Sequence, residues 1–351
     1  MPRGISGMNP QIAALNFFGE SPMPALERFE VEYDGIHHLN IEERWGKIIS
    51  NKPLFHDSLP TRLKVARLEW VPNPYLFAGS LAEHPQLIGL THLEIKFPPK
   101  LPKLEHINAL LAASPMLKVL YFDTRIRRCD HVHPEHQPQL SAGLPKVGLP
   151  NVRALGLLFN TSEVSPWWGY SLLLMLDAPN VQSLRLLLER PGCRARAPVD
   201  EGFIQHLTKG ADKAKPKPLF PLLTSLELTE PRLGPSSRKS LAQELLEAYP
   251  NITTLILPLS TQAHLLGIQP WLVPCLKRLV IHAKLASDLR ESISERCMAA
   301  LGLKTVEVLV FGSDKEKVQS EYREALDGLG VDVCFSDLSY RSREILGFED
   351  F

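Results

Sequence analysis

A short pattern that recurs along the chain constrains its fold more than any other feature of the sequence. A proline is followed by apolar residues two, five and seven positions later, and this arrangement occurs seven times. The copies read PALERFEV from Pro24, PMLKVLYF from Pro115, PNVRALGL from Pro150, PNVQSLRL from Pro179, PLLTSLEL from Pro221, PNITTLIL from Pro250 and PCLKRLVI from Pro274. Three looser copies lack the proline, at Val65/Leu68/Trp70, Leu90/Leu93/Ile95 and Val306/Leu309/Phe311. The first apolar positions of successive copies lie 24 to 42 residues apart, so the sequence predicts about ten irregular repeats.

The spacing within each copy predicts a short strand. Two apolar residues separated by one residue point to the same face of a strand, and the earlier apolar residue turns inward just before it. Proline suits the entry to such a strand because it fixes the chain direction and donates no hydrogen bond there.

Segments with helical spacing lie between the predicted strands. Leu104, Ile107 and Leu110 share one helix face, and ASDLRESISERCMAAL and KEKVQSEYREALDGL have a similar pattern. SSRKSLAQELLEAY is a further such segment. A strand followed by a returning helix, repeated at this period, predicts an α/β solenoid with a curved parallel sheet on its concave side and helices on its convex side.

These units resemble leucine-rich repeats of the irregular kind, over about Pro24 to Gly312. More narrowly, P-N-V-x-x-L-x-L, F-P-x-L-T-S-L-E-L and V-P-x-L-K-R-L-V-I are similar to the C-terminal repeats of fungal F-box proteins. The resemblance implies a substrate-recognition region of a cullin-type ubiquitin ligase, although no F-box is evident in this chain. The expected divisions are a lead-in at 1–23, repeats at 24–312, a capping helix and strand at 313–338 and a tail at 339–351.

Composition argues against several classes of protein. Lys+Arg and Asp+Glu balance at 39 each, whereas nucleic-acid-binding proteins usually carry a basic excess. No apolar run approaches the length of a membrane span, and the N-terminus lacks the apolar core of a signal peptide. The five cysteines never form C-x-x-C, which fits a reducing compartment. We expect a monomer in the cytoplasm or nucleus.

The residues between the inward apolar positions are predicted to point to the concave surface. Candidate partner-binding residues on it are Arg67, Glu69, His92, Glu94, Tyr121, Arg185, Glu227, Ile256, Arg278 and Val280. The last repeats turn apolar there, at Ile256, Val280, Val308 and Val310. This strip has two interpretations: an exposed protein-docking face, or core covered by the tail or by the end of the array.

A second candidate surface is the rim where the chain leaves the strands. Arg125, Arg128, Arg190 and Arg194 lie at such positions, and stacked repeats would bring them onto one edge. Such an edge suits an acidic partner, but interleaved acidic residues favour a solvated rim of mixed charge.

The stretch CDHVHPEH contains the weak metal-ligand candidates His131, His133 and His136. It is similar to the H-x-H-x-D-H motif of metal-dependent hydrolases, but Glu135 replaces the aspartate and a repeat array surrounds it. We interpret it as a solvated inserted loop and expect no cofactor.

No P-loop, G-x-S-x-G or H-E-x-x-H motif occurs in the sequence. The first hypothesis is therefore a non-catalytic solenoid that binds a protein target, with a ubiquitin-ligase adaptor as a second partner if an F-box lies upstream. The alternatives are a repeat scaffold with no ligase connection and, more remotely, a metal-dependent hydrolase that uses the histidine-rich loop.

Overall fold

The chain divides into two compact units in the computed structural model, the first formed by Met1–Val152 and Glu163–Ala178 and the second by Arg153–Ser162 and Pro179–Phe351. The structure describes residues 10–31, 53–55, 59–77, 85–98, 101–124, 144–160, 165–189, 198–210, 216–229, 241–257, 260–282, 286–310 and 315–337.

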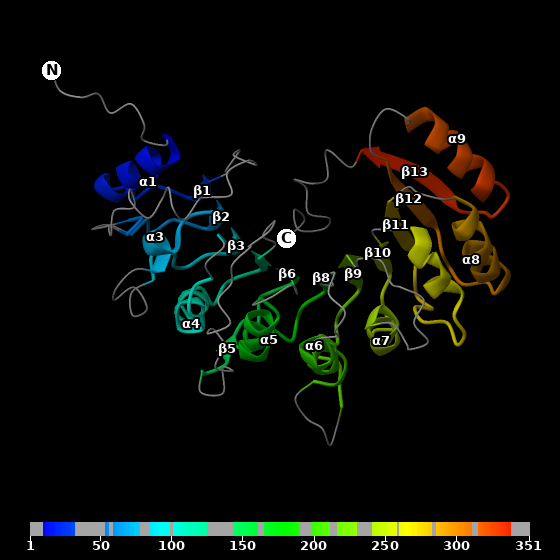
Figure 1. The fold of residues 1–351 in the computed structure, drawn as a ribbon, viewed down its shortest axis with the longest axis horizontal. Helices are drawn as coiled ribbons and strands as arrows, with labels where there is room; N and C mark the ends of the chain where they lie inside the picture. Colours follow the sequence, from blue (N-terminus) through cyan, green and yellow to red (C-terminus); the bar gives the residue numbers. More distant parts are fainter. Residues whose placement is uncertain are drawn as a thin grey trace. The chain divides into compact units, whose positions relative to one another are not determined.

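Among its described residues, the first unit has four main parallel strands in sequence order. They are β1 (Arg28–Val31), β2 (Val65–Glu69), β3 (His92–Lys96) and β4 (Val119–Asp123). The short strands β5 (Val147–Gly148) and β7 (Leu176–Asp177) pair separately. The helices are α1 (Pro10–Glu20), α3 (Asn73–Phe77), α4 (Leu104–Ala112) and α5 (Ser165–Met175). Helices α3, α4 and α5 lie on one side of the four strands (Figure 1).

The described residues of the second unit repeat the same arrangement with seven parallel strands, again in sequence order. The strands are β6 (Ala154–Asn160), β8 (Ser183–Glu189), β9 (Ser225–Thr229), β10 (Thr254–Leu257), β11 (Arg278–His282), β12 (Thr305–Val310) and β13 (Asp332–Asp337). The helical segments are α6 (Pro198–Lys209), α7 (Leu241–Ala248), the 3-10 helix η2 (Ser260–Gly267), α8 (Ala286–Met298) and α9 (Lys315–Leu326).

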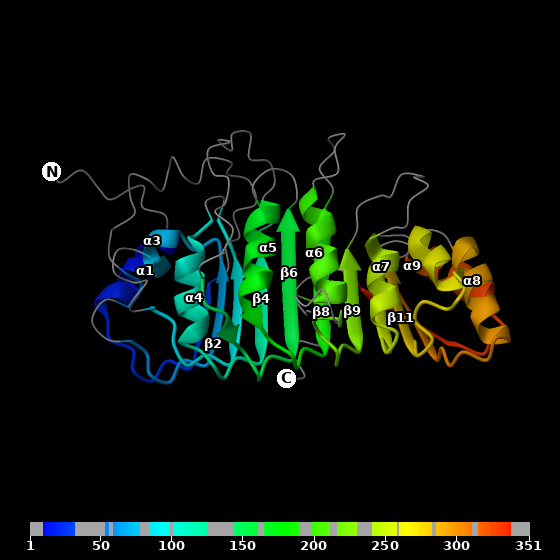
Figure 2. The ribbon, with the colours of Figure 1, turned by 90° about the horizontal axis from the view of Figure 1, so that it is seen from below.

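Parallel neighbours require a crossover connection, and helices provide many of these crossovers. Within each unit, Figure 2 shows helices in front of strands that point in one direction. Each unit is therefore a repetitive α/β array, as the sequence pattern predicts, and α4, α7, α8 and α9 lie within the segments that have helical spacing.

The apolar positions of the pattern form the core between strands and helices. In the copy that begins at Pro115, Leu117, Leu120 and Phe122 are each 0% exposed. Burying such a side chain contributes roughly 1.5–3 kcal/mol, and in a repeat array neighbouring repeats supply the cover.

A ladder of hydrogen bonds joins the turns that precede the strands. The Lys64 carbonyl oxygen accepts bonds from the backbone N–H groups of Thr91 and His92, at 2.8 and 3.0 Å. The Thr91 hydroxyl donates to the same oxygen at 3.2 Å. In the P-N-V copy, Asn151 donates from Nδ2 to the Pro115 carbonyl oxygen at 3.2 Å. The polar residues at the strand entries thus tie each repeat to the one before it.

Helix α1 lies within the segment that the sequence indicates only as a lead-in. Phe18 of α1 packs edge-on against Phe29 of β1, with ring centroids 5.0 Å apart, and Phe29 contacts Phe55 at 5.6 Å. The helix therefore extends the aromatic core beyond β1. Its weak amphipathic pattern explains why the sequence does not reveal it.

Two predicted repeat alignments are wrong. In β12, Val306 and Val308 pair with Leu279 and Ile281 of β11, so both face the core. The first apolar position of this repeat is then Leu303, which is 6% exposed, rather than Val306. Val308 and Val310, predicted on the concave surface, are 0% and 3% exposed. The run TVEVLV fits the pattern in two alignments that differ by three residues, and the difference moves every side chain to the other face.

The alignment of β2 is shifted by two residues. Leu63, Ala66 and Leu68 are the buried positions, at 0% to 2% exposed, in place of the predicted Val65/Leu68/Trp70 set. A shift of two leaves the alternation unchanged, so Arg67 keeps its predicted face.

Candidate functional site

The strand face opposite the core carries the side chains that alternate with the buried positions, and we call it the open face. Strand register aligns these side chains in rows across the first unit. Glu30, Arg67 and Glu94 occupy one row on β1, β2 and β3, and Glu69 and Lys96 are partners in the next. Charge alternates along both rows, so each charged side chain has an opposite charge beside it.

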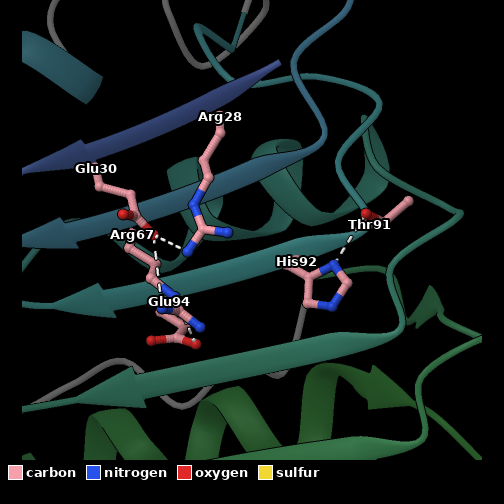
Figure 3. A network of polar contacts seen from close by, with 6 residues as sticks. All are labelled: Arg28, Glu30, Arg67, Thr91, His92 and Glu94. Atoms are coloured by element: carbon pink, nitrogen blue, oxygen red, sulfur yellow. Dashed lines mark hydrogen bonds and ion pairs between the residues drawn. The ribbon is translucent and has the colours of Figure 1, made fainter. Parts of the chain in front are cut away.

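The first row forms a network of ion pairs (Figure 3). Arg67 reaches Glu94 with Nε at 3.2 Å from Oε1 and reaches Glu30 with Nη1 at 3.5 Å from Oε1. Arg28 approaches the same Glu30 oxygen at 2.6 Å. In the second row, Lys96 Nζ lies 3.0 Å from Glu69 Oε2. The sequence therefore places Arg67, Glu69 and Glu94 correctly on one face, but it does not indicate their pairing or the part of Lys96.

Burial perturbs two titratable groups of this face. Desolvation raises the pKa of the Glu94 carboxyl above its usual value, and the charge and hydrogen bond of Arg67 partly offset this effect. Desolvation lowers the pKa of His92, and the positive charges of Arg67, Lys118 and Arg28 lower it further. His92 Nδ1 lies 3.0 Å from the Thr91 hydroxyl oxygen. Burial and the neighbouring positive charges therefore both favour the neutral form of the imidazole.

These ion pairs contribute little to the stability of the fold. The side chains of Arg28, Arg67 and Glu30 are 57%, 34% and 37% exposed, and exposed pairs of this kind are worth about 0–1 kcal/mol each. The network instead holds charged groups in a fixed order on a surface that the helices do not cover. The arrangement suits recognition of another charged surface.

Tyr121 does not belong to an accessible surface. It occupies the register position next to Glu94, as predicted, but it is only 3% exposed, and every residue of β4 is buried. Alternation predicts which face of a strand a side chain occupies. It does not predict whether other side chains cover it, because cover comes from parts of the chain that are distant in sequence.

The open face of the second unit is polar at β8–β9 and apolar further on. Arg185 Nε lies 2.9 Å from Glu227 Oε1, and both side chains are mostly buried, at 19% and 13% exposed. Ile256 and Val280 are 3% and 0% exposed and form a buried cluster with Leu309. Ile256 and Val280 are therefore not an exposed docking surface, and their burial agrees with the interpretation as core, whereas Val308 and Val310 lie on the opposite face.

A buried carboxylate lies next to this apolar cluster. Glu307 of β12 is 2% exposed and accepts hydrogen bonds from Arg278 Nη2 at 2.6 Å and from Ser336 Oγ at 2.5 Å. The sequence analysis predicts Arg278 on this face but misses Glu307. Aligning the repeat on Leu303, Val306 and Val308 would have identified it, since Glu307 then falls between two inward positions.

The predicted rim and metal candidates lie outside the described residues. This concerns Arg125, Arg128, Arg190 and Arg194 of the rim and the three histidines His131, His133 and His136. Among the residues that the structure describes, no group of three or more His, Cys, Asp or Glu side chains has the geometry to hold a metal ion. In the same part of the chain, no helix is long and apolar enough to cross a membrane.

Comparisons with known proteins give no match: no family model, no curated protein and no solved structure is similar to this chain at a significant level. The functional argument therefore starts from the geometry of the open face.

Proposed function

We propose that the chain is a non-catalytic solenoid of the leucine-rich-repeat type that binds a protein partner. The repeated L-x-x-L-x-L spacing supports this proposal, as do the parallel strands in sequence order. Repeat arrays of this kind present extended surfaces that suit protein binding better than small-molecule chemistry.

One observation carries the proposal: the alternating row of Glu30, Arg67 and Glu94 on the open face of the first unit. Arg67 is fixed between two carboxylates, yet about a third of its side chain remains exposed. Pre-ordered charges of this kind lose little conformational entropy when a partner binds, and their alternation selects a partner of complementary charge.

The resemblance to the repeats of fungal F-box proteins extends the proposal to one partner class. In that case the partner is a substrate that the repeats present to a cullin-type ubiquitin ligase in the cytoplasm or nucleus. The competing proposal is a repeat scaffold that acts without a ligase. Both use the same face, and they differ in whether ligase subunits accompany the partner.

Affinity purification with matched variants tests the docking face. The test variant combines Arg67→Ala with Glu94→Ala. The control combines Lys103→Ala with Glu105→Ala, which removes one positive and one negative charge at exposed positions around α4. We expect a partner that co-purifies in stoichiometric amount with the wild type and the control but is reduced at least tenfold with the test variant.

Two outcomes decide among the proposals. A partner retained equally by all three proteins contradicts docking on this face. A partner lost with the test variant supports it, and the presence or absence of adaptor and cullin in the same eluate separates the ligase from the scaffold.

A further inference from the structure

Positive charge is in excess where the strands of the first unit begin. The residues that immediately precede β1 to β4 are Glu27, Lys64, Thr91 and Lys118. The ladder of backbone hydrogen bonds places Lys64, Thr91 and Lys118 at the entries of consecutive strands. Both lysines are exposed, one on either side of Thr91. We call this surface the entry edge of the first unit.

The charges behind the entry edge are already balanced. Arg28 and Arg67 share Glu30, and Arg67 also pairs with Glu94. Among the described residues of the edge itself, one carboxylate, that of Glu27, stands against three exposed cations, those of Arg62, Lys64 and Lys118. Within the described part of the chain, the contact found for the Lys64 ammonium is with a backbone carbonyl, that of Gly89, at 3.4 Å. The edge thus has positive charge that its own carboxylates do not neutralise.

We propose that the entry edge of the first unit binds a carboxylate-rich segment of a partner polypeptide. This inference rests on the docking function proposed above and specifies the chemistry of the partner. The partner segment lies across the strand entries, its carboxylates on Lys64 and Lys118, while the alternating row orients the flanking residues.

Spacing along the edge suits an extended polypeptide. Lys64 and Lys118 precede strands two apart, and neighbouring strands are about 4.8 Å apart, so the lysine backbones are separated by about 10 Å. Side chains on one side of an extended segment repeat about every 7 Å. Flexible lysine side chains can therefore reach two acidic residues that are separated by one or three other residues.

His92 provides a specific sign of binding. It lies on β3 between the two lysine positions and projects from the same face as Arg28 (Figure 3). The charged groups around it are Arg28 of the first strand, Arg67 of the second, Glu94 of its own strand and Lys118 before the fourth. A partner carboxylate beside this imidazole favours its protonated form. Binding then takes up a proton, and affinity rises as pH falls through the pKa of the bound state.

Fluorescence anisotropy with a labelled hexaglutamate peptide and the full chain, at low ionic strength and pH 6.5, tests the site. The test variant combines Lys64→Gln with Lys118→Gln. The control combines Lys277→Gln with Lys304→Gln, which are exposed lysines at the equivalent positions before β11 and β12. We expect the test variant to weaken binding at least tenfold and the control to change it less than twofold. Equal losses in both variants, or no binding by the wild type, overturn the proposal.

A second arm compares pH 6.0 with pH 8.0, where glutamate side chains remain mostly ionised. We expect the wild type to bind several-fold more tightly at pH 6.0 and His92→Gln to lose this difference. Retention of the full pH effect in His92→Gln overturns the placement of the segment beside His92. This inference can fail while the docking proposal stands. If a natural partner is lost with the Arg67/Glu94 variant but still binds the Lys64/Lys118 variant, the open face remains the docking face and the acidic-segment inference is wrong.

Discussion

Replacing Arg278 destabilises the protein more than replacing its partner Glu307, although Arg278 is the more exposed of the two. The Arg278 side chain is 44% exposed, whereas that of Glu307 is 2% exposed. Arg278→Ala leaves a buried carboxylate without its guanidinium donor, and losing one member of a buried pair costs about 3–5 kcal/mol. Since Ser336 still donates to Glu307 and Arg278 is itself half exposed, we expect a smaller loss than that range, about 2–3 kcal/mol.

Glu307→Gln has a smaller effect. Glutamine keeps the shape and one acceptor oxygen, and the half-exposed guanidinium can turn to water, so we expect a loss of about 1 kcal/mol. The double variant Arg278→Ala/Glu307→Gln should be about as stable as Glu307→Gln alone, which gives a coupling energy of about 2 kcal/mol.

Urea unfolding followed by circular dichroism measures these differences, provided that the slope of the transition is unchanged. An Arg278→Ala variant within about 0.5 kcal/mol of the wild type would refute the reasoning. So would a double variant whose loss equals the sum of the two single losses, because the two side chains would then be independent.

Three further predictions concern other buried groups. Tyr249→Phe should lower the free energy of unfolding by about 1 kcal/mol, because the buried Tyr249 hydroxyl donates to the Leu207 carbonyl oxygen at 2.6 Å; urea unfolding without such a loss contradicts this role. Arg296→Met should lower the free energy of unfolding by about 2 kcal/mol in the same assay, because the fully buried Arg296 donates to two backbone carbonyls and lies over the Trp271 ring at 5.6 Å. An Arg296→Lys variant as stable as the wild type would show that the planar guanidinium is not required. Burial lowers the pKa of His92 below its usual 6.5, so the folded state favours the neutral imidazole, and the wild type should lose stability relative to His92→Gln as pH falls below 6.5. A difference in urea midpoint between the two proteins that stays constant from pH 8 to pH 5 would contradict this prediction.

The sequence predicts the repeat architecture because the core of each repeat is local. Leu117, Leu120 and Phe122 lie within six residues, and their spacing alone indicates a strand with one buried face. The same rule places Arg67 and Glu94 on the open face. It cannot show that they form an ion pair, because their register depends on hydrogen bonds between repeats, such as that from Thr91 to Lys64.

Alignment and cover are the two features that the sequence does not determine. The sequence pattern assigns Val308 to the wrong face, because valines occupy alternative positions of this repeat and the alignments are distinguished by pairing with β11. The pattern assigns Tyr121 to the correct face, but its side chain is buried, as are those of Ile256 and Val280. In each case the answer depends on contacts from distant parts of the chain, which a pattern of period two does not contain.

Site-specific photo-crosslinking tests the central claim most directly. A photoreactive amino acid replaces Val65, which lies partly exposed on the open face between Arg28 and His92, and in a second protein it replaces Ala112, which is exposed on α4. The account predicts that the partner identified by affinity purification crosslinks from position 65 and not from position 112. A partner that crosslinks from position 112 and not from position 65 would show that the helices, rather than the open face, form the binding surface.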